Sequence, residues 1–382
     1  MKKILTIIGA RPQIIKSAAI SRAIRTKFSD KITEVLVHTG QHYSASMSDV
    51  FFTELGLSQP DYNLNVGSGS HGSQTAEMIK GIEELLEKEK PNAIVLYGDT
   101  NSTLAGAIAA SKIHVPVVHV EAGLRSYNKS MPEEINRIMC DHVSTLLFSP
   151  TKSGVLNLEK EDFKLNNEAP FSIDNPKVYH CGDIMYDNSI YFAEQLKNII
   201  PPYELMALQA ESFFLGTIHR PANTDNPEQL KSIFRAFIAL ANLYPSHSIY
   251  LPLHPRTRRA MNMHLEPEFL QRIEEKTQIK IIPPVSFMNM IALQQNCDLV
   301  ITDSGGLQKE AYFFEKPCVI LRPETEWVEI VEQGAAVLVD ADKDRIVDGV
   351  VSMMNQKELK FPLLYGDGKA AEFIVEEIIK HC

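Results

Sequence analysis

Short apolar runs alternate with longer amphipathic segments through the first half of the chain. The runs "KILTII" (3–8), "NAIVLY" (92–97) and "VPVVHV" (115–120) are bounded by glycine or polar residues, and segments with helical patterning stand between them. A continuous apolar run of this length indicates a strand that is buried on both faces. Strands that alternate with helices predict a parallel sheet with right-handed crossovers.

The second half repeats this pattern with "SFFLGT" (212–217), "SIYLPL" (248–253) and "DLVITD" (298–303). Between the halves, residues 197–211 carry two adjacent prolines and are typical of a linker, and residues 368–382 have the pattern of an amphipathic terminal helix. We therefore expect two doubly wound, Rossmann-like α/β domains, at residues 1–195 and 196–365, followed by a terminal helix at 366–382. Ligands of such domains bind at the carboxyl ends of the strands, which places the expected site in an interdomain cleft.

Composition narrows the class of protein. A chain of 382 residues with a net charge of -10 is long enough for two domains and has no broad basic surface for nucleic acid. No apolar stretch approaches the roughly 18 residues of a membrane span, and the first apolar run is too short for a secretory signal. The five cysteines form no C-x-x-C pair, which indicates reduced thiols in a cytoplasmic protein.

Cations, carboxylates and one glycine turn gather at the expected strand ends. "ITDSGGLQKE" (301–310) passes from an apolar strand through glycines into a helix, and such a turn binds anions through its backbone N–H groups. Cations also bind phosphate, an acidic residue inside such a helix can accept from a ribose diol, and further carboxylates suit acid–base chemistry on a sugar. The pattern therefore predicts a nucleotide-sugar site, with candidates Arg11, Lys16, Asp99, Glu121, Glu133, Arg137, His219, His254, Ser304, Gly305, Gly306 and Glu310.

Structural roles compete with functional ones at several polar positions. His38 and His42 are four residues apart, but they run from a strand into a glycine turn and need not share a face, so we expect no metal there. Glu134 is expected to complement the helix dipole, and His119 to be a buried histidine with satisfied hydrogen bonds. Lys309 is expected on a solvated face.

Taken in order, the motifs resemble those of the non-hydrolysing UDP-N-acetylglucosamine 2-epimerases. The resemblance rests on "GARPQIIK", "HTGQH", "GDTNSTLAGA", "HVEAGLRS", "PEEINR", "IHRPANTDNP" and "TDSGGLQKEA" and covers nearly the whole chain. It implies a glycosyltransferase-B-like (GT-B) fold whose terminal helix packs on the first domain. It also implies a cytoplasmic homodimer that needs no metal and no nicotinamide cofactor, and that serves surface polysaccharide synthesis such as lipopolysaccharide.

Within this family the chain is more similar to the branch that acts on UDP-2,3-diacetamido-2,3-dideoxyglucuronate. "GARPQ", "LRSYNKSMPEEINR", "PLHPRTR" and "TEWVE" carry this similarity. The branch that acts on UDP-GlcNAc more often has "GTRPE", so Gln13 replaces a glutamate here, and Ala222 replaces another in "HRxEN". Both differences concern the substituents of the sugar. An uncharged Gln13 would suit a negatively charged sugar.

The resemblance implies a reaction that inverts the carbon bearing the acetamido group, by elimination of UDP to a 2-acetamidoglycal and re-addition. By matching motifs, Arg11 and His219 would hold the pyrophosphate, with His254 and Gly306 completing the UDP site. Ser304 and Gly305 would bind phosphate, and Glu310 the ribose. Asp99, Glu121 and Glu133 would form the acid–base set, with Lys16 orienting one of them, while Gln41, His42 and Arg137 match a region where some relatives bind a UDP-sugar activator.

Three other readings fit part of the pattern. A hydrolysing epimerase, which releases mannosamine and UDP, would share almost every motif. A retaining GT-B glycosyltransferase would need an acceptor site and would leave the three carboxylates without a role. A non-catalytic nucleotide-sugar-binding module would have no need of those carboxylates.

Overall fold

The chain divides into two compact units, which are described separately below. This computed structural model describes residues 1–40, 52–196, 211–356 and 358–382. Unit 1 comprises Met1–Ile190 and Leu363–Cys382, and unit 2 comprises Tyr191–Pro362. The expected linker at 197–211 lies, except for its last residue, outside the described residues. No helix in the described ranges has both the length and the apolar character of a membrane span.

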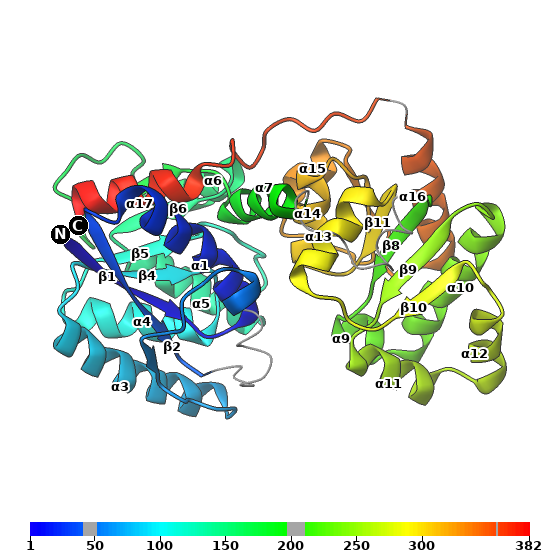
Figure 1. Cartoon of the computed structure of the whole chain (residues 1–382), viewed down its shortest axis with the longest axis horizontal. Helices are drawn as coiled ribbons and strands as arrows, with labels where there is room; N and C mark the ends of the chain where they lie inside the picture. Colours follow the sequence, from blue (N-terminus) through cyan, green and yellow to red (C-terminus); the bar gives the residue numbers. More distant parts are fainter. Residues whose placement is uncertain (41–51, 197–210, 357) are drawn as a thin grey trace. The chain divides into compact units, whose positions relative to one another are not determined.

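Unit 1 is built on a parallel sheet with the strand order β3-β2-β1-β4-β5-β6-β7 (Figure 1). Apolar residues alternate between its two faces, since Ile4 and Val95 point to one side and Leu5 and Ile94 to the other. The strand bounds are Lys2–Ile8 (β1), Ile32–His38 (β2), Tyr62–Asn63 (β3), Ala93–Tyr97 (β4), Val117–Val120 (β5), Leu146–Ser149 (β6) and Lys177–His180 (β7).

Helices cover both faces of this sheet, as expected for strands that are apolar on both sides. One face packs against α1 (Arg11–Ala23), the π-helical turn η1 (Ile24–Phe28) and α17 (Ala370–His381). The other face packs against α3 (His71–Glu89), α4 (Asn101–Lys112) and α5 (Pro132–His142). Two further helices, α6 (Lys152–Lys160) and α7 (Ile184–Leu196), begin in this unit.

The terminal helix α17 belongs to unit 1 although the whole of unit 2 stands between it and the rest of this unit in sequence. Its buried Ile374, Val375 and Ile378 join the same core as Ile20 of α1. The carboxylate of Asp187 on α7 accepts the backbone N–H groups of Ala370 and Ala371 at 3.2 and 2.7 Å, which fixes the first turn of α17. The C-terminal segment is thus an integral part of the first unit.

Unit 2 has a second parallel sheet with the order β10-β9-β8-β11-β12-β13. Helices α10 and α16 lie on one side of it and α13 and α14 on the other (Figure 1). Its strands are Phe213–Thr217 (β8), Ser248–Pro252 (β9), Ile279–Ile282 (β10), Leu299–Thr302 (β11), Cys318–Ile320 (β12) and Ala336–Leu338 (β13). The helices that begin within its residues 211–356 are Pro221–Thr224 (α9), Pro227–Leu243 (α10), Pro255–His264 (α11), Pro267–Glu274 (α12), Phe287–Asn296 (α13), Gly305–Phe313 (α14), Val328–Glu332 (α15) and Lys343–Asn355 (α16).

Candidate active site

In unit 1, an ion pair joins the loop after β5 to helix α1. Glu121 directly follows β5, and its Oε2 lies 2.6 Å from Nζ of Lys16, with both side chains 12% exposed. Low exposure strengthens such a pair because it is only weakly screened by solvent. Lys16 therefore holds the Glu121 carboxylate in one position.

A second cation, Arg137, sits between two carboxylates of the same unit. The Arg137 guanidinium on α5 contacts Asp99 Oδ2 after β4 and Glu134 Oε2, the latter at 2.5 Å. Burial alone would lower the pKa of Arg137, but Asp99, Glu134 and Glu121 outweigh this effect and raise it. Asn136 adds a hydrogen bond to the Asp99 carbonyl at 3.0 Å. The carboxylates of Asp99 and Glu121 thus share one electrostatic environment.

The two glutamates at the start of α5 have different surroundings. Glu134 is 1% exposed, and its oxygens accept the N–H groups of Ser126 and Tyr127 at 3.0 and 2.9 Å. It therefore anchors the preceding loop, a larger role than the expected complement to the helix dipole. Glu133 is exposed in the first turn, and Arg11 is exposed in the first turn of α1, so both can meet a ligand in solvent.

His119 is buried and fully hydrogen-bonded, as the sequence predicts. Its Nδ1 lies 2.6 Å from Asp141 Oδ1 and its Nε2 lies 2.8 Å from the Gly98 carbonyl oxygen, and both side chains are inaccessible to solvent. Asp141 was not among the residues singled out from the sequence. It lies near the end of α5 without any motif, so only the fold brings it to the strand ends.

In unit 2, one buried carboxylate organises the loop after β8. Asp303 follows β11 and is 0% exposed. Its oxygens accept the backbone N–H groups of His219, at 3.0 and 3.1 Å, and of Arg220, at 3.0 Å, together with the Asn223 amide at 3.0 Å. Asp303 therefore fixes the backbone that carries His219. The motif "TDSGG" contains this aspartate, but the sequence drew attention to the serine and the glycines.

The predicted anion site is a helix N-terminus in the structure. Ser304 caps α14, and its hydroxyl accepts the N–H of Leu307 at 3.4 Å. The first N–H groups of a helix have no intrahelical acceptor, so those of Gly305 and Gly306 are placed for an anion. Near Gly305, the Arg322 guanidinium forms an ion pair with Glu326 at 2.9 Å. Since the Glu326 carboxylate lies as near to Gly305 as its partner Arg322 does, the attraction for an anion at this turn comes from the helix N–H groups.

Two histidines, His219 and His254, also lie at the strand ends of unit 2. His219 is 46% exposed in its side chain, and its Nδ1 lies 3.5 Å from Asp303. Desolvation, together with Arg220 and His254, lowers the pKa of His219 more than Asp303 raises it, so the ring is neutral at pH 7. His254 caps α11 by accepting the Arg256 N–H at 3.2 Å.

Glu310 on α14 has an orienting partner that the sequence did not indicate. The amide Nε2 of Gln294, a fully buried residue of α13, donates to Glu310 Oε2 at 2.9 Å. A neutral donor holds the carboxylate in place while leaving its charge uncompensated by this contact. Gln294 is thus a positioning residue for the Glu310 carboxylate.

Several expectations about single residues change with the structure. Gln13 is 1% exposed: its oxygen accepts the Gly9 and Ala10 N–H groups and its amide donates to Tyr97 and Thr103, so it supports the fold and does not face a sugar. The prediction that Lys309 is solvated is wrong, because it is 3% exposed and its Nζ lies 4.2 Å from the centre of the Trp327 ring. Gln41 and His42 lie outside the described residues. Within the described ranges, no group of three or more histidine, cysteine or acidic residues is placed to hold a metal.

Comparison with known proteins identifies the class. Residues 25–379 match the family model described as UDP-N-acetylglucosamine 2-epimerase. The chain belongs to this family, whose members are isomerases. It is 46% identical over 379 residues to UDP-2,3-diacetamido-2,3-dideoxy-D-glucuronate 2-epimerase of Pseudomonas aeruginosa, covering 99% of both chains. It is 40% identical over 377 residues to UDP-N-acetylglucosamine 2-epimerase of Methanocaldococcus jannaschii, covering 98% of both.

Solved structures of the family have the same fold. The M. jannaschii UDP-GlcNAc 2-epimerase in complex with UDP-GlcNAc and UDP matches with a TM-score of 0.84 and 38% identity, over 99% of both chains. The Neisseria meningitidis enzyme bound to UDP-GlcNAc matches with a TM-score of 0.83 and 29% identity, over 99% of this chain and 100% of the other. These matches confirm the predicted GT-B-like class with two doubly wound α/β halves and the predicted family.

Proposed function

We propose that this UDP-sugar 2-epimerase inverts C2 of a UDP-2-acetamido sugar by eliminating and re-adding UDP, so that the product is again a UDP-sugar and no free sugar is released. The observation that carries the proposal is the division of chemistry between the units. Asp99 and Glu121, each paired with a cation, stand at the strand ends of unit 1. The anion-binding turn at Ser304 and the glutamate that follows it stand at those of unit 2. One set suits proton transfer and the other suits a nucleotide diphosphate.

The proposed reaction has two halves that are each other's reverse. A carboxylate takes the C2 proton as the C1–O bond to UDP breaks, which gives a C1=C2 double bond and free UDP in the site. A second carboxyl group, which is protonated at this point, then delivers its proton to the opposite face of C2 while a UDP oxygen attacks C1. Asp99, Glu121 and Glu133 supply these two groups, and Lys16 orients Glu121 through their ion pair.

Charge on the departing UDP also needs stabilisation. Arg11 and His219 hold the pyrophosphate, with His254 near it, and the N–H groups of Gly305 and Gly306 bind a phosphate. Glu310, oriented by Gln294, accepts hydrogen bonds from the ribose hydroxyls. The buried Asp303 keeps the His219 backbone in place throughout.

For the sugar, we propose UDP-2,3-diacetamido-2,3-dideoxyglucuronate as the preferred substrate. The support is the 46% identity to the P. aeruginosa enzyme of that name over nearly the whole chain. Gln13 is not part of this argument, because its side chain is used within the fold. UDP-GlcNAc, the substrate named for the more distant relatives, is the alternative.

We also propose that the enzyme acts as a homodimer in the cytoplasm and supplies precursors for surface polysaccharide. The support is the family resemblance alone. Light scattering after gel filtration tests the first part, with an expected mass about twice the 42.9 kDa of one chain. A mass equal to one chain would contradict it.

Proton NMR of the reaction in D2O tests the proposed chemistry. The protein is incubated separately with UDP-2,3-diacetamidoglucuronate and with UDP-GlcNAc. The expected product is a UDP-sugar with the manno configuration and deuterium at C2, formed faster from the uronate. Free UDP with a released mannosamine derivative would assign the protein to the hydrolysing epimerases, and inversion without deuterium would contradict C2 proton transfer.

A further inference from the structure

The buried histidine of β5 has hydrogen-bond acceptors on both ring nitrogens. Nδ1 of His119 faces the Asp141 carboxylate at 2.6 Å, and Nε2 faces the Gly98 carbonyl oxygen at 2.8 Å. A neutral imidazole has one N–H and can satisfy only one of these partners. Both nitrogens therefore carry hydrogen, and the ring is a buried cation. Burial opposes this charge, but the neighbouring Cys140 and Asp141 raise the pKa of His119 well above its usual range.

Asp141 extends the contact to the next loop. Its second oxygen accepts the Gly123 N–H at 3.1 Å and pairs with the Arg125 guanidinium at 2.7 Å. Arg125 in turn forms a two-pronged ion pair with Glu161, at 2.7 and 2.8 Å. Positive and negative side chains thus alternate along this series, so each buried charge lies next to one of opposite sign, as a low-dielectric interior requires.

The two backbone groups held in this way flank the carboxylates proposed to move protons. Gly98 immediately precedes Asp99, and Gly123 follows Glu121 by two residues. All three positions Gly98, Glu121 and Gly123 have positive φ, at 62, 75 and 80°. For Glu121 this conformation is unfavourable and persists only where its surroundings impose it. The loop therefore depends on contacts such as the one from Asp141.

We propose that His119 and Asp141 are positioning residues that set the distance and direction of the Asp99 and Glu121 carboxylates relative to each other. Together they form a clamp from the Gly98 carbonyl to the Gly123 N–H, and neither residue is exposed to the substrate. The proposal rests on the proposed function, in which these two carboxylates transfer protons at C2. A misplacement of about 1 Å between reacting groups can lower a rate about 100-fold.

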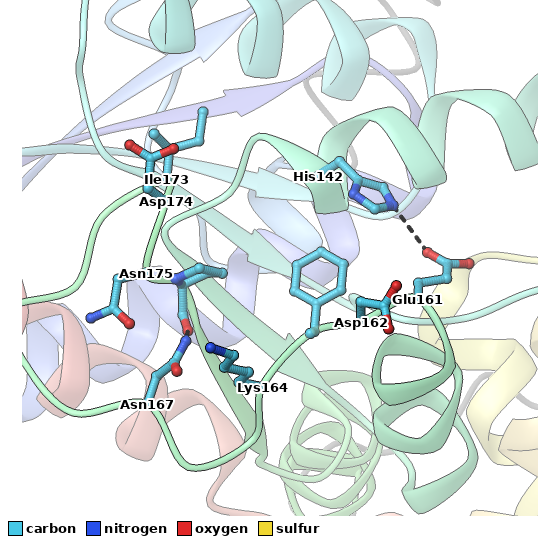
Figure 2. A pocket seen from close by; sticks show the side chains of 10 residues that line it. His142, Glu161, Asp162, Lys164, Asn167, Ile173, Asp174 and Asn175 are labelled. Carbon is cyan, nitrogen blue, oxygen red and sulfur yellow. Dashed lines mark hydrogen bonds and ion pairs between the residues drawn. The ribbon is translucent and has the colours of Figure 1, made fainter.

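The series of charged side chains that begins at His119 ends at the surface in a second histidine–carboxylate pair, His142 and Glu161. This pair provides a matched control. Figure 2 shows His142 and Glu161 at a cavity of about 250 Å³, with the ring Nε2 3.2 Å from the carboxylate. The His142 side chain is 48% exposed. Glu161 also holds Arg125 in the loop that carries Glu121, so the control replaces His142 alone, which leaves the Arg125–Glu161 and Asp141 contacts in place.

Two variants of Asp141 separate geometry from fold. Asp141→Asn can keep the hydrogen bonds while losing the charge that pairs with Arg125: its amide donates to a neutral His119, its oxygen accepts the Gly123 N–H, and His119 still donates to Gly98. Asp141→Ala loses the contacts of residue 141 to both His119 and Gly123. We expect kcat of Asp141→Ala to fall about 100-fold with KM within about threefold, and kcat of Asp141→Asn to stay within about tenfold of wild type. His142→Gln should stay within about twofold.

UDP affinity and circular dichroism establish that each variant is folded and binds through unit 2. If Asp141→Ala does not fold, His119→Asn replaces it, since the shorter side chain cannot reach from Asp141 to Gly98, and the same loss of kcat is expected. A folded Asp141→Ala or His119→Asn with kcat within about fivefold of wild type would overturn the proposal. So would an Asp141→Asn variant as impaired as the alanine variant. A wild-type enzyme that inverts neither sugar would instead refute the proposed function.

Discussion

The strand-end loops of the two units differ in how they use charge. In unit 1, the two strand-end carboxylates proposed to transfer protons are each paired with a cation, Glu121 with Lys16 and Asp99 with Arg137. In unit 2, the carboxylate Asp303 is turned inward, where it accepts backbone N–H groups and leaves a rim of histidine and helix N–H donors outside. The same α/β architecture thus presents bases in one unit and an anion site in the other.

This difference shows that the architecture alone does not determine the chemistry of a strand end. Parallel sheets bring loops together at one edge in both units. Whether this edge suits proton transfer or anion binding depends on which charged side chains are buried, where they hold the backbone, and which are exposed. The comparison predicts that changes to the strand-end carboxylates of unit 1 affect turnover, whereas changes to the anion site of unit 2, and to Arg11 that is proposed to join it, affect UDP binding.

Glu121→Gln should cause the largest change in turnover. It removes a carboxylate from the proton-transfer step but keeps its size, so we expect kcat to fall about 1,000-fold while the thermal midpoint changes little. Initial rates from NMR with the preferred UDP-sugar measure the effect. Activity within a few-fold of wild type would exclude Glu121 from the mechanism.

Glu310→Ala should weaken UDP binding about tenfold. The variant loses charge-assisted hydrogen bonds to the ribose, which are worth about 1.5–3 kcal/mol each when buried and less at an accessible site. Titration calorimetry with UDP gives the dissociation constant. If affinity is unchanged and only kcat falls, Glu310 belongs to the proton-transfer chemistry and the comparison fails.

Gln294→Ala should weaken UDP binding by only about threefold. Gln294 does not contact the ligand in this account; it orients Glu310 through one hydrogen bond of 2.9 Å. In the double variant Gln294→Ala/Glu310→Ala the two losses should not add, because the first residue acts through the second. Additive losses in calorimetry would show that Gln294 has an independent role.

Asp187→Asn lies outside both sites and should leave kcat within about twofold, while changing the pH dependence of stability. Burial, aided by Asp183, raises the pKa of Asp187 from 3.8 to about 6 despite its hydrogen bonds to Ala370 and Ala371. Between these two pKa values the folded chain binds a proton that the unfolded chain has released, so stability from this group falls as pH rises. The full effect is at most about 3 kcal/mol.

Urea unfolding of wild type and Asp187→Asn at about pH 4.5 and about pH 7.5 measures this effect. Relative to the variant, wild type should be more stable at the lower pH than at the higher one. An equal change with pH in both proteins would show that the carboxyl group of Asp187 does not titrate with a raised pKa.

Hydrophobic patterning predicted most of the fold because buried parallel strands require continuous apolar runs. β1, β4, β8 and β11 lie where such runs stand in the sequence. β6, at Leu146–Ser149, was not predicted, since a run of four residues between polar ones is too short to be distinguished from a buried loop. The packing of Lys309 over Trp327 was also missed, because a charged residue in a helix carries no sign of an aromatic partner.

The candidate site was predictable where residues follow a strand directly, as Asp99, Glu121 and Ser304 do. Residues that support the site from other elements were not. Asp141 and Gln294 lie on helices, and only the fold brings them to Gly98, Gly123 and Glu310. Sequence patterns identify groups that meet a ligand, whereas the buried groups that orient them depend on tertiary contacts.

The most direct test of the division between the units is a calorimetric titration of UDP into the Glu121→Gln variant. If unit 1 supplies the proton-transfer groups and unit 2 the UDP site, the variant should bind UDP with the wild-type dissociation constant, within about twofold, although it is nearly inactive. A loss of UDP affinity as large as that of Glu310→Ala would contradict this account, because it would place the Glu121 carboxylate in the UDP site itself.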